Sequence, residues 1–164
     1  AVGVALFAMA GLVGAAAGAV GTVVLDITTY GDMVLRGRPS SDAPSTLVKN
    51  VAASAGIESL TGDDDTAKNR RSGASALLGY VNGVGIGALY GAIRPSLRGV
   101  PALVAGLALG AAAMAASDVP LVKTGATDPD TWGTEGWLAD IVPHALYGLA
   151  LAFAFDALQE SGSG

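Results

Sequence analysis

The single histidine of the chain, His144, follows Asp140 by four residues. Residues four apart on a helix lie on one side of it and can touch, so this spacing predicts a carboxylate–imidazole pair. A carboxylate fixes the tautomer of a neighbouring imidazole, and the two groups together can take up or release a proton. The spacing is equally typical of a structural pair that joins two helices, and both interpretations stay open.

Asp118 is the second acidic residue in an unusual place. It lies near the carboxyl end of an apolar segment, just before Val119 and Pro120, where the helix dipole disfavours an anion. We therefore expect Asp118 to have a partner, which is a proton, a donor on another helix or a cation. Asp140 is near the start of its own segment, where it could serve as an N-cap. Asp118, Asp140 and His144 form the candidate polar pocket.

The sequence offers few residues for nucleophilic catalysis, metal binding, phosphate binding or nucleic-acid binding. The chain has no Cys and one His, so it has neither a thiolate nucleophile nor the ligands of a common zinc site. It contains neither a Gly-x-Ser-x-Gly elbow nor a Gly-x-x-x-x-Gly-Lys phosphate loop. With 9 Lys and Arg against 14 Asp and Glu, it is a poor candidate for binding nucleic acid. We expect a protein without catalytic residues, metal or cofactor.

The elements that position these residues are apolar segments of membrane-spanning length. No charged residue occurs in 1–25, 72–93 or 99–117, and 136–155 is interrupted only by Asp140 and His144. About 20 apolar residues are needed to cross a bilayer as a helix. We predict an all-α integral membrane protein whose four transmembrane helices form one bundle over residues 1–160. The spans are expected at about 2–26, 72–94, 99–118 and 137–158, followed by a flexible tail or linker at 161–164.

The first segment is longer than the apolar region of a signal peptide, so we interpret it as a retained span. The chain is then expected to be a multi-pass protein of the cell (plasma or inner) membrane. Seven of the nine Lys and Arg residues follow spans one and three, and two follow span two. This count places the termini outside by the positive-inside rule, but residues before Ala1 would change it. The orientation is left open.

Between spans one and two, residues 44–60 predict an amphipathic helix in the headgroup plane. Pro44 suits a first helical turn and Gly62 an exit. The next residues are charged, and they lack the spacing of a calcium-binding loop. We interpret them as a solvated turn into span two; they are Asp63, Asp64, Asp65, Lys68, Arg70 and Arg71.

Glycines recur at four-residue spacing in three of the spans. They are Gly79, Gly83, Gly87 and Gly91 in span two, Gly14 and Gly18 in span one, and Gly106 and Gly110 in span three. Lipid gives apolar helices no reason to associate, so close backbone contact along small residues has to provide it. The pattern predicts glycine-zipper packing, first within the chain and second between copies in a homo-oligomer.

The second half of the chain resembles the YagU-like inner-membrane proteins (the DUF1440 family). The residues that carry the resemblance are Asp118-Val119-Pro120-Leu121, Gly125, Asp128-Pro129, Trp132 and Asp140-Ile141-Val142-Pro143-His144. The resemblance implies a small multi-span bundle without known enzymatic activity, linked loosely to acid tolerance. This chain differs from that family in having no further histidine within its spans.

Two functions follow as hypotheses. The first is a membrane protein without enzymatic activity that handles protons or cations through Asp118, Asp140 and His144, between spans three and four, in transport or envelope stress. The second is a structural or accessory subunit whose Gly79–Gly91 groove docks a membrane protein partner or a second copy. A membrane-embedded enzyme is a weaker idea, because Asp140 and His144 lack a nucleophile. In each case the lipid bilayer is the expected surrounding.

Overall fold

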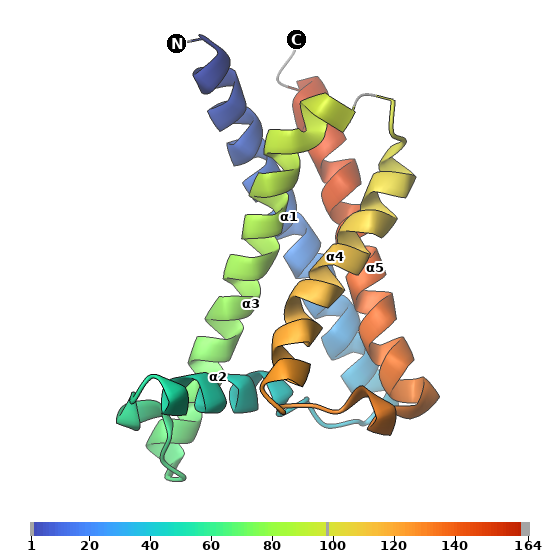
Figure 1. Ribbon diagram of the computed structural model, residues 1–164. Coiled ribbons are helices and arrows are strands. Elements are labelled where there is room, and N and C mark those ends of the chain that lie inside the picture. Colours follow the sequence, from blue (N-terminus) through green and yellow to red (C-terminus); the bar gives the residue numbers. More distant parts are fainter. Residues whose placement is uncertain (1, 98, 162–164) are drawn as a thin grey trace.

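A computed structural model describes residues 2–97 and 99–161, so most of the predicted tail lies outside the described residues. The described part is helical and contains no strand. Its long helices are α1 (Val2–Arg36), α3 (Asp65–Ile93), α4 (Ala102–Lys123) and α5 (Gly133–Ser161) (Figure 1). All four are long and apolar enough to cross a membrane, which confirms the all-α membrane fold predicted from the sequence.

The four helices form an open bundle. α1 packs against both α3 and α5, and α5 also packs against α4. α3 and α4 are joined by a short 3-10 turn, Arg94–Leu97, but contact each other little. Figure 1 shows α1 and α3 crossing in the half that carries the termini and moving apart toward the end that carries α2. The bundle is therefore closed near the termini and splayed at the other end.

The helices extend beyond the predicted spans because the chain lacks a helix breaker where its charges begin. α1 continues past the expected end at residue 26 to Arg36, and Gly37 then adopts a φ of 65° ahead of Pro39. Asp32 stabilises this last part, because it accepts hydrogen bonds from Arg36 at 2.6 Å and from Arg38. The first charged residue of a span thus does not mark its end.

The amphipathic helix between the first two spans, α2 (Ala43–Ser54), is shorter than the predicted 44–60. Gly56 ends it with a φ of 70°, and the amide of Ile57 bonds back to the carbonyl oxygen of Ala52 at 2.9 Å. This is the Schellman arrangement, in which glycine accepts a backbone conformation that disfavours side chains. The prediction overlooked this earlier glycine in favour of Gly62. α2 crosses the splayed end of the bundle (Figure 1).

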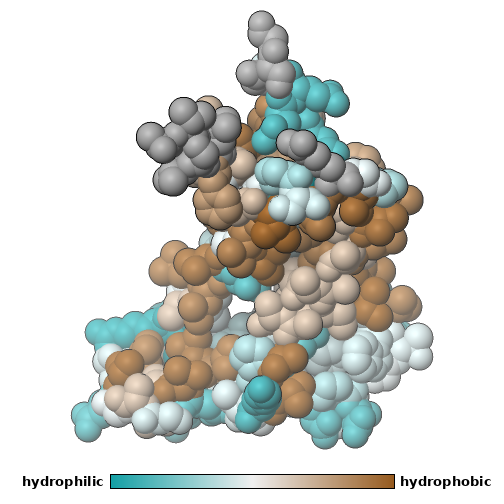
Figure 2. Space-filling model, turned by 45° about the horizontal axis from the view of Figure 1, so that its top comes forward, coloured by the Kyte–Doolittle hydropathy of each residue, from teal (hydrophilic) through white to brown (hydrophobic). Residues whose placement is uncertain are grey.

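The outer surface of the helices is apolar. Leu12, Leu77 and Leu89 expose 72%, 67% and 68% of their surface. Figure 2 shows brown, hydrophobic atoms over the helices and teal, hydrophilic atoms toward the end that carries α2. Soluble monomers rarely leave so much contiguous apolar surface in water. Acyl chains are the solvent that this surface fits.

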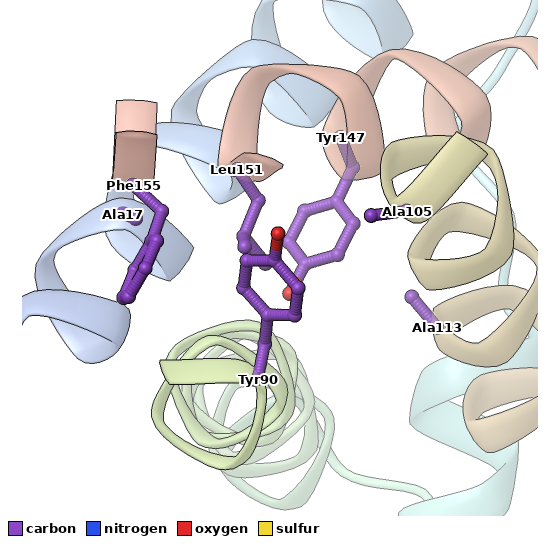
Figure 3. Packing of buried hydrophobic residues seen from close by; sticks show 7 residues of the cluster. All are labelled: Ala17, Tyr90, Ala105, Ala113, Tyr147, Leu151 and Phe155. Carbon is purple, nitrogen blue, oxygen red and sulfur yellow. The ribbon is translucent and has the colours of Figure 1, made fainter. Parts of the chain in front are cut away.

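The core between the helices is small and combines alanine with large aromatic rings. The rings of Tyr90 on α3 and Phe155 on α5 meet edge to face, with centroids 5.2 Å apart. Tyr147 and Leu151 of α5 complete this layer (Figure 3). Alanines of α1 and α4 face the rings, so the neighbouring helices can come close to α5.

Candidate functional site

The glycines of α1 and α3 bring two helix backbones into contact. A Cβ atom built on Gly14 would lie 2.8 Å from the Cα of Gly91, and one on Gly87 would lie 2.6 Å from the Cα of Gly18. Both distances are shorter than real contacts of a Cβ atom, so only glycine fits there. Gly83 also faces α1, where Thr22 fills the space of its missing side chain. Gly79, the fourth member of the series, has no atom within 4 Å of such a Cβ.

A second close approach joins α4 to α5. A Cβ atom on Gly148 would lie 2.8 Å from the Cα of Gly110, and one on Gly106 would lie 2.8 Å from the Cα of Leu149. Gly110 itself lies against the backbone of His144 and Ala145. This crossing carries the imidazole of His144 to the surface of α4, where the candidate polar residues of that helix lie.

Asp140 and His144 touch as their spacing predicts. Nδ1 of His144 lies 3.2 Å from Oδ1 of Asp140 and 2.9 Å from its backbone carbonyl oxygen. Both partners are acceptors, so Nδ1 carries a hydrogen. Asp140 is not the N-cap that the sequence allowed, because α5 begins two turns earlier, at Gly133. Gly133, which adopts a φ of 61° directly after Trp132, begins the helix there.

Ser117, which was not predicted as a site residue, contacts the other side of the His144 ring. Its Oγ lies 3.3 Å from Nε2 of His144 and 3.0 Å from the carbonyl oxygen of Met114. The hydroxyl has one hydrogen, which it can give to Nε2 or to the carbonyl. It bonds a neutral His144 as donor, and after a rotation it bonds a charged His144 as acceptor. The imidazole can therefore gain a proton and keep its hydrogen bonds.

Asp118 lies beside this group, because its Oδ1 lies 3.5 Å from Oγ of Ser117 and its carboxyl is close to that of Asp140. Oδ2 of Asp140 is buried and has no hydrogen-bond donor among the described residues. A neighbouring carboxyl can become that donor only when it carries a proton. The structure thus brings Asp118, Asp140 and His144 together between α4 and α5, in an arrangement with room for a shared hydrogen.

A polar cavity of about 900 Å³ leads from the splayed end of the bundle to His144. All five α-helices contribute to its wall, and α2 lies at its mouth. Thr22, His144 and Tyr147 line its inner part, in company with Gly79 and Gly83. Figure 2 shows a hollow between the two sides of the bundle on the face in view. No local sequence pattern predicts this cavity, because its lining residues come from helices far apart in the sequence.

The opposite end of the bundle is closed. Tyr90, Leu151 and Phe155 are almost completely buried between the cavity and the end that carries the termini. Beyond them, Nη2 of Arg94 forms an ion pair of 3.3 Å with Oδ2 of Asp156. The cavity therefore leads to one end of the bundle, and an apolar layer separates it from the other.

One part of the predicted solvated turn is wrong. Arg71 exposes only 7% of its surface, and its Nη1 donates hydrogen bonds to the carbonyl oxygens of Leu60 and Gly62. After Gly56 ends α2, the chain folds back over Arg71. The pattern of charges in the sequence does not predict this fold-back. Asp64 caps α3 instead, since its carboxylate accepts from the amide of Ala67 at 3.0 Å. That bond lowers the pKa of Asp64.

Comparison of the chain with protein-family models, with curated proteins and with solved structures finds no match. The resemblance to the YagU-like proteins stays a prediction.

Proposed function

We propose that this protein has no enzymatic activity and carries protons through the group formed by Ser117, Asp118, Asp140 and His144. The observation that carries the proposal is the position of His144. Its imidazole contacts Asp140 on one side and Ser117 on the other, and its side chain, 14% exposed, borders the polar cavity. The role would be transport or the response of the envelope to stress.

A titrating group within a bilayer has to reach water, and the cavity supports this. Its polar wall extends from α2 to the imidazole, so water in it would connect His144 with one side of the membrane. The aromatic layer of Tyr90 and Phe155 would hold the opposite side closed. The arrangement corresponds to one of the two states that alternating access requires.

A proton suits the group better than a metal ion. Within the described residues, no three His, Asp or Glu side chains are arranged to hold a metal. A proton needs only the carboxyl and imidazole atoms that already face one another. The alternative is that a monovalent cation binds near the two carboxyls. The experiment below distinguishes proton transport from cation transport.

The proposed docking of a partner through the Gly79–Gly91 groove receives less support. Gly83, Gly87 and Gly91 lie against α1 of the same chain, which fills the groove. A second copy would have to displace α1 before it could use those glycines. We therefore place the function in the polar group and the cavity.

The test uses the purified protein in sealed liposomes with a pH-sensitive dye inside. An imposed pH gradient should drive proton uptake in the parent, and Asp118→Asn and His144→Ala should abolish it. Asp130→Asn, on an exposed turn, is the matched carboxyl control and should keep the parent rate. A sodium or potassium gradient without a pH gradient tests cation transport. Absence of flux in the parent, or equal flux in all variants, would contradict the proposal.

A further inference from the structure

A second feature of the cavity is a group of cations at its mouth, distant from His144. Lys49 on α2 and Lys68 and Arg71 on α3 all line this end. It is also the end at which α2 crosses the bundle and at which both α3 and α2 begin. In a bilayer this level corresponds to the phosphate groups of the lipids, where an amphipathic helix such as α2 lies.

Carboxylates nearby already bind the two lysines. Nζ of Lys49 lies 2.6 Å from Oδ1 of Asp63, and Nζ of Lys68 lies 3.5 Å from Oδ1 of Asp65. The hydrogen bond from Lys49 lowers the pKa of Asp63, and the charges of Arg71 and Lys68 act in the same direction. The three cations therefore lie close enough together to act on the same carboxylate.

Arg71 differs from the lysines because no carboxylate among the described residues forms an ion pair with it. Both of its hydrogen bonds, at 2.9 and 2.7 Å, use Nη1 and end on backbone carbonyl oxygens. Nε and Nη2 have no acceptor among the residues that the structure describes. Arg71 exposes only 7% of its surface and borders the cavity, and a guanidinium with two free donor nitrogens is suited to an anion with two acceptor oxygens.

The opening between α3 and α4 indicates where such an anion would come from. These helices contact each other little, so no close seam between them closes the cavity. A lipid could place its phosphate at Arg71 and leave its acyl chains along α3 and α4. Basic sites between transmembrane helices at the headgroup level recognise anionic lipids in this way.

We propose that the mouth of the cavity binds the phosphate of an anionic phospholipid, with Arg71 as its main ligand. Ser72, which also lines this part of the cavity, would supply a hydroxyl donor to a remaining oxygen. Asp26 and Asp42 line the cavity as well, and they would favour a phosphodiester of single charge over a more highly charged group. This inference does not depend on proton transport.

The experiment measures lipid binding to the whole chain in a neutral detergent by native mass spectrometry. Phosphatidylglycerol, phosphatidylcholine and inorganic phosphate are titrated separately. The parent should prefer phosphatidylglycerol to phosphatidylcholine, and Arg71→Gln should weaken phosphatidylglycerol binding about tenfold, as the loss of a charged hydrogen bond implies. Arg70→Gln is the matched control, because Arg70 is exposed and does not line the cavity. It should change binding by less than about twofold.

Arg71→Gln also removes a cap from two carbonyl groups, so Arg71→Lys is measured beside it. The lysine keeps the charge but loses the planar fork, and binding should fall between that of the parent and Arg71→Gln. Equal binding of the two lipids by the parent would overturn the proposal, as would equal losses in Arg71→Gln and Arg70→Gln. Inorganic phosphate that binds as tightly as phosphatidylglycerol would overturn the assignment to a lipid.

Discussion

The hydroxyl of Tyr147 on α5 donates a hydrogen bond of 2.7 Å to the backbone carbonyl oxygen of Gly83 on α3. The bond crosses the bundle at the inner end of the cavity. The ring can approach α1 because Gly21 has no side chain; a Cβ atom there would lie 2.9 Å from Cδ2 of Tyr147. Tyr90, the other large buried tyrosine, has a hydroxyl without a hydrogen-bond partner among the described residues. The two tyrosines thus provide a matched pair for measuring what such a bond contributes.

Tyr147→Phe should lower the free energy of unfolding by about 1–2 kcal/mol, because the variant loses its bond to Gly83. Tyr90→Phe should leave it unchanged or raise it, since that substitution removes a buried hydroxyl that pairs with nothing described. Unfolding in mixed detergent micelles, followed by circular dichroism, gives both values. A larger loss in Tyr90→Phe than in Tyr147→Phe would contradict the hydrogen-bond assignment.

The glycine contact between α1 and α3 predicts a position-dependent effect of one methyl group. Gly87→Ala should destabilise the fold by about 1–3 kcal/mol, because its Cβ would meet the backbone of Gly18 at 2.6 Å. Gly79→Ala places the same methyl group in open space and should be neutral or stabilising, since alanine favours a helix over glycine. The same unfolding assay compares them, and equal effects at the two positions would argue against this crossing of α1 and α3.

The N-cap of α3 predicts how stability depends on pH. The bond from the amide of Ala67 lowers the pKa of Asp64 below its usual value of about 3.9. A carboxyl with a lowered pKa in the folded state stabilises it above the ordinary pKa, and this contribution is lost as the pH falls through the lowered value. Asp64→Ala should therefore have a lower melting temperature than the parent at pH 5–7, and the difference should shrink below about pH 4. A difference that stays constant down to pH 2 would rule out the titration of Asp64 as its source.

The fold could be predicted from the sequence because uninterrupted apolar segments leave few alternatives. Helix ends were less predictable: α1 continues for ten residues past Asp26, since no glycine with a positive φ or proline stops it before Gly37. The end of α2 at Gly56 was predicted six residues too late, because Gly56 and Gly62 look alike in the sequence.

The site was predictable only where its residues are neighbours along the chain. The contact of Asp140 with His144 follows from their spacing on one helix. Ser117 reaches His144 only because Gly110 lets α4 approach α5, and the cavity depends on the sparse contact between α3 and α4. The burial of Arg71 likewise depends on how the chain returns after α2. These are contacts between different helices, and they cannot be predicted from the residue spacing within one helix.

The central claim is that a water-accessible cavity lies inside a bundle whose outer surface faces lipid, and substituted cysteines test it most directly. The chain has no native Cys, so Gly79→Cys and Leu78→Cys each introduce a single thiol on α3. Gly79 lines the cavity with space for a side chain, whereas Leu78 is 53% exposed outside it. In liposomes, a charged maleimide should label Gly79→Cys and leave Leu78→Cys unlabelled, because the reactive thiolate forms only in water. Equal labelling of the two, or labelling of Leu78→Cys alone, would contradict the claim.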